Sequence, residues 1–211
     1  HNWPHAYHGQ LINTVSSGNP AAIIFDIIFD EENTFKYDLV NALASDNQSN
    51  NEALSNVTNQ FLYSNDPTKF VTAISNSRKT YNAIVFEAED TLNFLPKMDS
   101  EPEGYNYTDH IILNVSDEAK KRLPKADRIG NTYVELLSSS VGNGSANFPQ
   151  DEDGVIRRAP TAIYFDGPDH VYPSLVMSAA IDILGIKKNG GFDYDFEEKV
   201  LRLIDTTNTV V

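Results

Sequence analysis

The sequence predicts an α/β protein with three layers: a mixed, largely parallel sheet, helices on both of its faces and an antiparallel extension. Two observations carry this prediction. Short apolar runs bounded by turn residues alternate with segments of helical periodicity, which is typical of parallel strands joined by right-handed helical crossovers. Later in the chain, two short β-rich runs (155–158 and 162–165) follow an acidic turn, and their pairing would make the sheet mixed.

The first part of the chain predicts a helix followed by a buried strand. Apolar residues at helical spacing run from Leu11 to Val15, and the turn residues 17–20 end this helix. Residues 21–29 (AAIIFDIIF) then form a short β-branched apolar run. Such a run is typical of a strand buried on both faces of a parallel sheet, and Asp30 follows its end.

A second helix and strand lie between two polar insertions. Residues 31–65 are dense in Asn and Ser, and residues 87–110 are rich in Asp and Glu among Pro and Gly, so both are predicted to be flexible. Asp66 and Pro67 mark a helix start, an N-cap residue followed by Pro at the first helical position. The apolar face of this helix precedes a buried strand at 83–86.

The region from Val141 to Gly185 gives the densest set of signals. A strand ends near Asn147 and is followed by the acidic turn 151–154, in which Gly154 stands at the position most in need of a positive φ. Pro173 opens an apolar-periodic helix that Gly185 ends. Further elements are predicted as a strand at 111–115, a helical turn at 117–123, a helix at 133–137 and a terminal hairpin of 192–196 with 200–204.

Composition limits the classes of function. The 211 residues predict one domain spanning 1–211, and the net charge of −14 argues against nucleic acid as a partner. Cysteine is absent, which excludes thiolate chemistry and disulfides. No apolar run reaches the roughly 18 residues of a membrane span. The chain starts at His1 without Met, so we expect it to be a piece of a longer protein.

Several separated motifs form a set. They are Trp3-Pro4-His5 with Tyr7-His8-Gly9-Gln10-Leu11-Ile12; Ala22 to Phe29; Asp66 with Phe70, Ala73 and Ile74 before Ile84-Val85-Phe86; Gly142 and Asn147; Asp151; Asp153-Gly154-Val155 with Arg157-Arg158 and Pro160; and Tyr172-Pro173-Ser174-Leu175. Taken together, these motifs resemble the type two CHASE domain, a sensory extracellular domain associated with cyclases and histidine kinases. Two features depart from the family pattern. His5 or Ala6 stands where the family usually has a basic residue. The linker from Asp30 to Asp66 is longer than usual, and Asp38 competes with Asp66 for the matching acidic position.

The resemblance implies a module outside the cytoplasmic membrane, periplasmic or extracellular, in a bacterial membrane receptor. The parent chain would carry membrane helices and an intracellular output such as an adenylate or diguanylate cyclase or a histidine kinase. It implies no enzymatic activity and no cofactor for this part of the chain. The expected partners are a small-molecule or ion stimulus and, because such outputs act as dimers, a second copy in a homodimer.

The candidate ligand-binding residues lie at the predicted strand ends. In an open α/β sheet, ligands bind beyond the carboxyl ends of the strands. The residues that could meet there are Asp26, Asp30, Asn147, Asp151, Asp153, Arg157 and Arg158. They predict a polar sensing pocket, or a hard-cation site made of carboxylate oxygens. The alternative is structural: Asp151 and Asp153 shape a turn, and Arg157 or Arg158 pairs with Asp26 or Asp151.

The main alternative to a sensor domain is an enzyme. A metal-assisted hydrolase could use Asp26, Asp30 and Asp153 as metal ligands. The five His residues do not have the spacing of a metal site, and the sequence contains no nucleophile elbow, P-loop or HExxH motif. The sequence therefore favours a sensor, with the hydrolase and a purely structural domain as alternatives.

Overall fold

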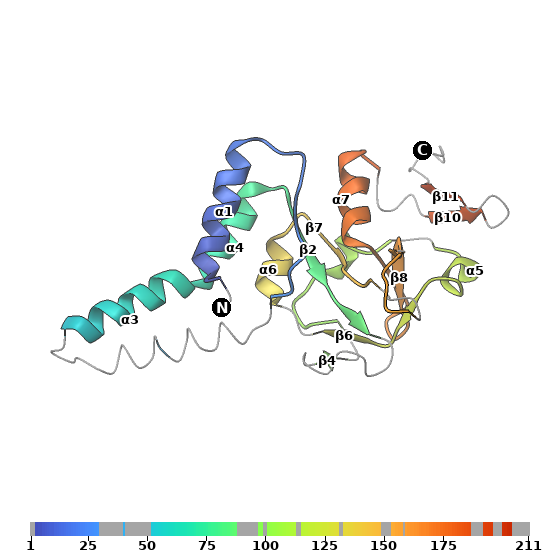
Figure 1. Ribbon diagram of the computed structural model, residues 1–211. Coiled ribbons are helices and arrows are strands. Elements are labelled where there is room, and N and C mark those ends of the chain that lie inside the picture. Colours follow the sequence, from blue (N-terminus) through green and yellow to red (C-terminus); the bar gives the residue numbers. More distant parts are fainter. Residues whose placement is uncertain are drawn as a thin grey trace.

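The helices and strands occur in an alternating order (Figure 1). The computed structural model describes residues 3–29, 40, 52–87, 97–98, 101–112, 115–130, 133–148, 153–157, 159–186, 192–195 and 200–203. Within them the helices are α1 (His5–Ser17), α3 (Glu52–Asn65), α4 (Pro67–Ser77), the 3-10 helix η1 (Tyr107–Asp109), α5 (Asp117–Lys120), α6 (Val134–Ser139) and α7 (Leu175–Ile183). The strands are β1 (Ile23–Phe25), β2 (Thr80–Ile84), β3 (Phe86–Glu87), β4 (Lys97–Met98), β5 (Lys125–Ala126), β6 (Arg128–Gly130), β7 (Gly142–Ser145), β8 (Ala162–Phe165), β9 (His170–Pro173), β10 (Phe192–Asp195) and β11 (Val200–Leu203).

A parallel sheet with the strand order β1-β2-β7 lies between the helices. Ile24 of β1 pairs with Tyr81 of β2, and Ala83 of β2 pairs with Gly144 of β7, all in parallel register. The helices α3, α4 and α6 lie in the connections between these strands, as expected for parallel strands that need a crossover. The carboxyl ends of all three strands therefore lie at one edge.

Helices cover both faces of this sheet (Figure 1). On one face, Tyr81 and Ala83 pack against Leu175 of α7. On the other, residues of α1, β1, α4 and α6 form a second buried cluster, which consists of Ile12, Phe25, Phe29, Phe70, Ala73, Ile74, Tyr133 and Leu136. Burying one side chain such as Phe70 stabilises the fold by about 1.5–3 kcal/mol. The predicted α/β class with three layers is confirmed.

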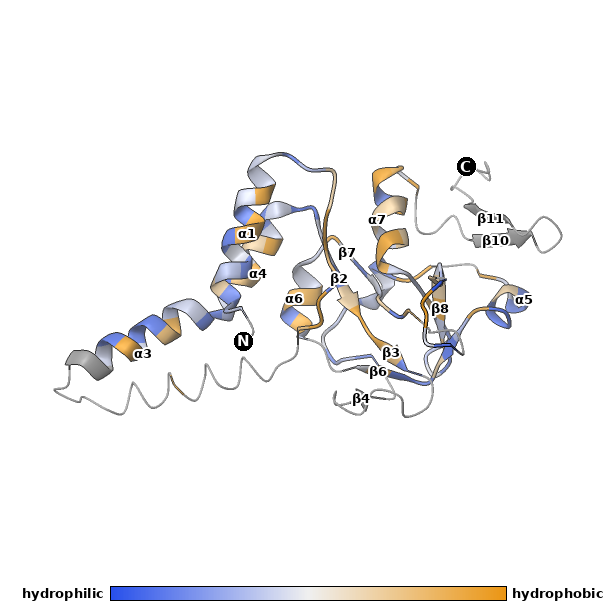
Figure 2. Ribbon diagram, viewed as in Figure 1, coloured by the Kyte–Doolittle hydropathy of each residue, from blue (hydrophilic) through white to orange (hydrophobic). Residues whose placement is uncertain are grey.

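Helix α7 packs directly on the backbone of β7. A Cβ atom on Gly144 would lie 2.6 Å from the Leu175 amide nitrogen, and one on Gly142 would lie 2.7 Å from the Ser178 hydroxyl oxygen. Only glycine fits this approach. Figure 2 shows α7 as hydrophobic along most of its length, and its outer residues Val176 and Ile183 are exposed.

The antiparallel pairings form further small sheets beside the parallel one. Strand β6 pairs with β3 and β4, β8 pairs antiparallel with β9 and parallel with β5, and β10 pairs with β11. The largest buried cluster lies under these strands and comprises Ile84, Phe86, Tyr105, Ile111, Ala126, Ile129, Leu137, Ile163, Phe165 and Tyr172. The predicted terminal hairpin is thus present, and so is antiparallel pairing beside the parallel sheet, but β8 pairs with β9 and not with the predicted run 155–158.

Several local predictions are confirmed by cap and turn geometry. Asp66 caps α4, accepting a hydrogen bond from the Thr68 amide at 2.9 Å, with Pro67 at the first helical position. Gly154 and Gly185 both have positive φ, 78° and 68°. These signals depend on neighbouring residues only, which is why the sequence predicts them well.

Other predictions need correction. The predicted strand 21–29 is shorter, because β1 pairs with β2 only at Ile23–Phe25. The predicted strand 83–86 is divided between β2 and β3. Residues 153–157 form a turn and an irregular segment instead of the strand predicted at 155–158. Pro173 belongs to β9, and Ser174 is the N-cap of α7. Part of the predicted insertion 31–65 forms α3.

Candidate functional site

The carboxyl edge of the parallel sheet is where the predicted site residues were expected. Asp26 follows β1 directly, and Asn147 follows β7 after one intervening residue. The predicted residues Asp30, Asp151 and Arg158 lie outside the described residues. Each described candidate can therefore be placed by its contacts.

At this edge the side chain of Asn147 makes the hydrogen bonds that a neighbouring strand would make. Its side-chain amide donates to the Phe86 carbonyl oxygen, and its Oδ1 accepts from the Phe86 amide at 2.9 Å. The Ser145 hydroxyl donates to the same Oδ1 at 2.9 Å and accepts from the Asn147 amide at 3.2 Å. Since these groups are saturated by the protein, the geometry favours a structural role for Asn147.

Asp153 and Arg157 form a bidentate ion pair. The two terminal nitrogens of Arg157 donate to the two Asp153 carboxylate oxygens at 2.9 and 2.7 Å, and the Val155 amide donates to Oδ1 at 3.1 Å. The Arg157 hydrogen bonds lower the pKa of Asp153, with a smaller effect from Val155. Asp153 shapes the turn, as the structural alternative predicted, whereas its pairing with Arg157 was not predicted.

Asp26 is exposed. The prediction placed this carboxylate inside a buried strand, where it would need a counter-charge. The strand ends at Phe25, so water solvates the carboxylate and no partner is required. Across the described residues, three or more His, Asp and Glu side chains nowhere converge as a metal-binding group.

A buried acidic side chain lies in the neighbouring core and was not predicted. Oε1 of Glu101 lies 2.6 Å from Nδ1 of His170 and accepts from the Tyr172 hydroxyl at 3.0 Å. Tyr172 is fully buried, and burial raises the pKa of its hydroxyl. His170 and Tyr172 are two apart on β9 and so share one face. Their shared partner Glu101 lies 69 positions from His170 and 71 from Tyr172 in the sequence, so no local pattern predicts the contact.

A second polar contact joins the loop 101–110, which also carries Glu101, to the parallel sheet. Asn143 of β7 donates to the Tyr105 hydroxyl oxygen at 3.1 Å and to the Leu137 carbonyl oxygen at 3.0 Å. The ring of His110 stacks on Tyr105 with centroids 5.4 Å apart. Burial raises the pKa of Tyr105. These groups lie inside the core and position the 101–110 loop.

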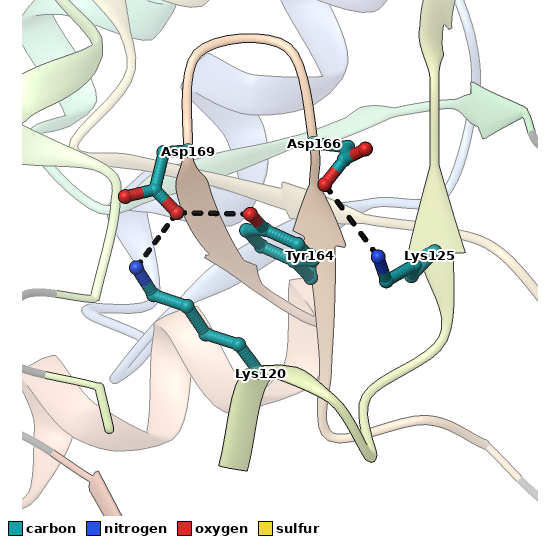
Figure 3. A network of polar contacts seen from close by, with 5 residues as sticks. All are labelled: Lys120, Lys125, Tyr164, Asp166 and Asp169. Carbon is teal, nitrogen blue, oxygen red and sulfur yellow. Dashed lines mark hydrogen bonds and ion pairs between the residues drawn. The ribbon is translucent and has the colours of Figure 1, made fainter. Parts of the chain in front are cut away.

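Five residues from the β8–β9 turn, β8, α5 and β5 form a polar cluster (Figure 3). The Asp169 carboxylate accepts from Lys120 of α5 at 2.7 Å and from the Tyr164 hydroxyl at 2.9 Å, and Lys125 lies 3.6 Å from Asp166. The hydrogen bond to Asp169 raises the pKa of Tyr164 to about 12, and Lys120 lowers the pKa of Asp169. The cluster joins α5 and β5 to the turn.

An open cleft lies along the seam between α1 and α4. It has a volume of about 330 Å³. Its lining residues are Ala6, Gly9, Gln10, Asn13, Tyr63, Thr68, Lys69, Thr72, Ala73 and Asn76. Ala6, Gly9 and Ala73 are buried and form the floor, while Gln10, Asn13, Thr72 and Asn76 are exposed. The sequence prediction missed this site because it lies between two helices and away from the strand ends.

Comparison with known families identifies the chain. A family model described as the CHASE2 domain matches residues 1–209. The chain belongs to the CHASE2 domain family. This match confirms the predicted resemblance. CHASE2 domains are extracellular sensory domains of signalling receptors and are not themselves catalytic. Among curated proteins and among solved structures, no significant match to this CHASE2 domain was found. Each helix in the described part of the domain is too short or too polar to cross a membrane.

Proposed function

We propose that this CHASE2 domain is the ligand-sensing input of a membrane-bound receptor whose output, a nucleotide cyclase, a diguanylate cyclase or a kinase, lies across the membrane. The observation that carries the proposal is the family match over residues 1–209. The absence of a catalytic role in CHASE2 domains agrees with an input that binds a stimulus and passes on a change of conformation.

The sensing mechanism requires two arrangements of the packed body. A ligand shifts such an equilibrium only by the difference between its affinities for the two states. The helices that cover the sheet are the elements best placed to differ, because α1 and α4 form one layer and α7 forms the other. Of the described residues predicted for the stimulus pocket, Asp26 and Asp153 both have exposed carboxylates, but Asp153 is paired with Arg157, so Asp26 is the one whose carboxylate is available to a ligand.

The extracytoplasmic location can be tested with single cysteines, because the chain has none. Ser75 is exposed on α4, whereas Ala73 on the same helix is 2% exposed. In whole cells that make the parent receptor, a membrane-impermeant maleimide should label Ser75→Cys and leave Ala73→Cys unlabelled. Labelling of Ser75→Cys only after lysis would contradict the proposed location.

We also propose that the domain acts as a homodimer through the outer face of α1. Tyr7, Leu11 and Val15 recur every four residues on this face and are 45%, 43% and 39% exposed, and Trp3, two residues before the helix, is 61% exposed. Helix α1 contains no Asp, Glu, Lys or Arg. Two chains of net charge −14 repel each other, so a second copy fits best against an uncharged face. Aromatic residues are enriched in such interfaces.

The oligomeric state tests this surface. We expect a dimer of the domain in light scattering coupled to size-exclusion chromatography. Leu11→Glu should give a monomer, because it introduces a desolvated charge into the interface. Val57→Glu is the control, since Val57 is 66% exposed on α3, outside this face. A monomeric wild-type domain, or a dimer that Leu11→Glu leaves intact, would contradict the proposal.

A further inference from the structure

The cleft between α1 and α4 exists because small residues let the two helices touch. A Cβ atom on Gly9 would lie 3.0 Å from the Lys69 carbonyl oxygen and 3.4 Å from Cα of Phe70, so the two backbones are in contact there. Ala6 and Ala73 complete the floor. Since these floor residues carry no large side chain, the longer polar residues on either side stand as walls around an open space.

The walls offer neutral hydrogen-bonding groups. Gln10 and Asn13 are three apart on α1, and Thr72 and Asn76 are four apart on α4, so each pair lies on one side of its helix. An amide side chain carries both donors and an acceptor, and a hydroxyl carries both functions. In the described part of the chain these four side chains make no hydrogen bond to the protein. Their polar groups are therefore available to a ligand.

The two features near the cleft that could bind an anion are already engaged, and the chain as a whole has a net charge of −14. The chain has 30 Asp and Glu residues, yet none of those that the structure describes lines the cleft, and among the described residues Lys69 is the single charged one in its lining. Its ammonium donates to the Tyr63 carbonyl oxygen at 2.9 Å and lies 2.9 Å from the centre of the Tyr63 ring. The nearby N-terminus of α4 is already capped by the Asp66 carboxylate. The cation and the helix end, the two usual anion-binding features, are both engaged.

From this arrangement we propose that the cleft between α1 and α4 binds a neutral, polyhydroxylated molecule, a sugar or a polyol. Adjacent hydroxyls match the paired amide and hydroxyl groups of the two walls, and the volume of about 330 Å³ is at the lower end of the range for small-molecule sites. Because the walls belong to different helices, a bound polyol bridges Asn13 of α1 to Asn76 of α4. That bridge favours one spacing of α1 against α4.

The role of this molecule as a stimulus rests on the sensory function proposed above, whereas its binding does not. Binding is measured by saturation-transfer-difference NMR on the 211-residue chain with D-glucose, D-galactose, myo-inositol and sorbitol. Succinate and glutamate form the anionic arm. We expect saturation transfer to at least one of the four neutral probes, and at least a tenfold loss of its affinity in Asn13→Leu/Asn76→Leu.

The control variant is Asn59→Leu, an exposed Asn on α3 that does not line the cleft, and it should bind the probe as the wild type does. Gly9→Ala places a methyl group against the Lys69 carbonyl and should weaken binding without touching a polar wall. No transfer to any neutral probe overturns the proposal. Unchanged binding of the probe in the double variant would also overturn it. A third contradicting result is that only the anions bind and that Lys69→Met abolishes their binding.

The output of the parent receptor separates the two proposals. If the neutral probe binds at the cleft and changes the output of the wild type, and the double variant no longer responds, both hold. If binding at the cleft is present and the output never changes, the sensory proposal fails for this site and the binding proposal stands. If the output responds to a different molecule and no polyol binds, the binding proposal alone fails.

Discussion

The side-chain amide of Asn147 pairs with the backbone of Phe86 as the peptide group of another strand would. Strand β6 and the residue before it bind the neighbouring carbonyl groups, because the Gly130 amide donates to the Val85 carbonyl and the Asp127 amide donates to the Glu87 carbonyl. The amide and carbonyl of Phe86 point the other way, where β7 has ended. Asn147 thus completes the hydrogen bonding of a core residue that is 1% exposed and joins the parallel sheet to the antiparallel one.

Asn147→Asp should destabilise the domain more than an ordinary surface change. The carboxylate keeps an acceptor for the Phe86 amide but faces the Phe86 carbonyl with a second oxygen in place of a donor. We expect a loss of about 1–3 kcal/mol in the free energy of unfolding, measured by urea denaturation. The same change at exposed Asn59 should cost under about 0.5 kcal/mol. Equal effects at the two positions would show that the Asn147 contact contributes little.

Gly144→Ala tests the contact between β7 and α7. The added Cβ would lie 2.6 Å from the Leu175 amide nitrogen and 2.7 Å from its Cα, and neither atom can rotate away. We expect a loss of about 3 kcal/mol or failure to fold. Gly154→Ala is the matched control, since its φ of 78° strains an alanine while no atom lies within 4 Å. That strain costs about 1–2 kcal/mol. A larger loss of stability in Gly154→Ala than in Gly144→Ala would therefore rule out the close packing of α7 on β7.

The pairing of Glu101 with Tyr172 is tested by a double-mutant cycle. Glu101→Ala leaves the hydroxyl of a fully buried tyrosine without its acceptor, which costs about 1–3 kcal/mol. Tyr172→Phe removes that hydroxyl, so the double variant should be less destabilised than the sum of the single ones. We expect a coupling of at least about 0.5 kcal/mol in chemical denaturation. Additive effects would mean that the two groups do not interact.

The sequence predicts those parts of the fold that depend on neighbouring residues. Asp66 as N-cap and Pro67 after it start α4. Gly154 in the turn and Gly185 after α7 both have the positive φ that was expected. Strand limits fail because they depend on a partner: β1 lies at the sheet edge and stops pairing at Phe25, although the apolar run continues to Phe29.

The candidate site was less predictable than the fold for a similar reason. A residue type such as Asp or Asn shows what a side chain can bind, but its partner decides whether it is available. Arg157 neutralises the Asp153 carboxylate, and the Phe86 backbone engages the side-chain amide of Asn147. The cleft residues Gln10 and Asn76 carry no motif, and only the packing of α1 on α4 brings them to one place.

His8 should make the stability of the domain depend on pH. It is 8% exposed and packs among Phe25, Phe29 and Phe70, with ring centroids 6.2, 5.2 and 5.3 Å away. Burial lowers the pKa of His8, and a hydrogen bond with the Trp3 backbone opposes this in part. As the pH falls below the unfolded pKa of about 6.5, the unfolded chain takes up a proton that the folded chain does not.

The stability of the wild type should therefore decrease below about pH 6.5, by at most about 1.4 kcal/mol per pH unit for this one group. Replacing His8 by Phe removes that contribution, so its advantage over the wild type should grow between pH 7 and pH 5 in urea denaturation. Phe29→Leu disturbs the same cluster without removing a titratable group, and its deficit should be constant with pH. Parallel curves for the wild type and His8→Phe would mean that His8 is protonated equally well in the folded and unfolded states.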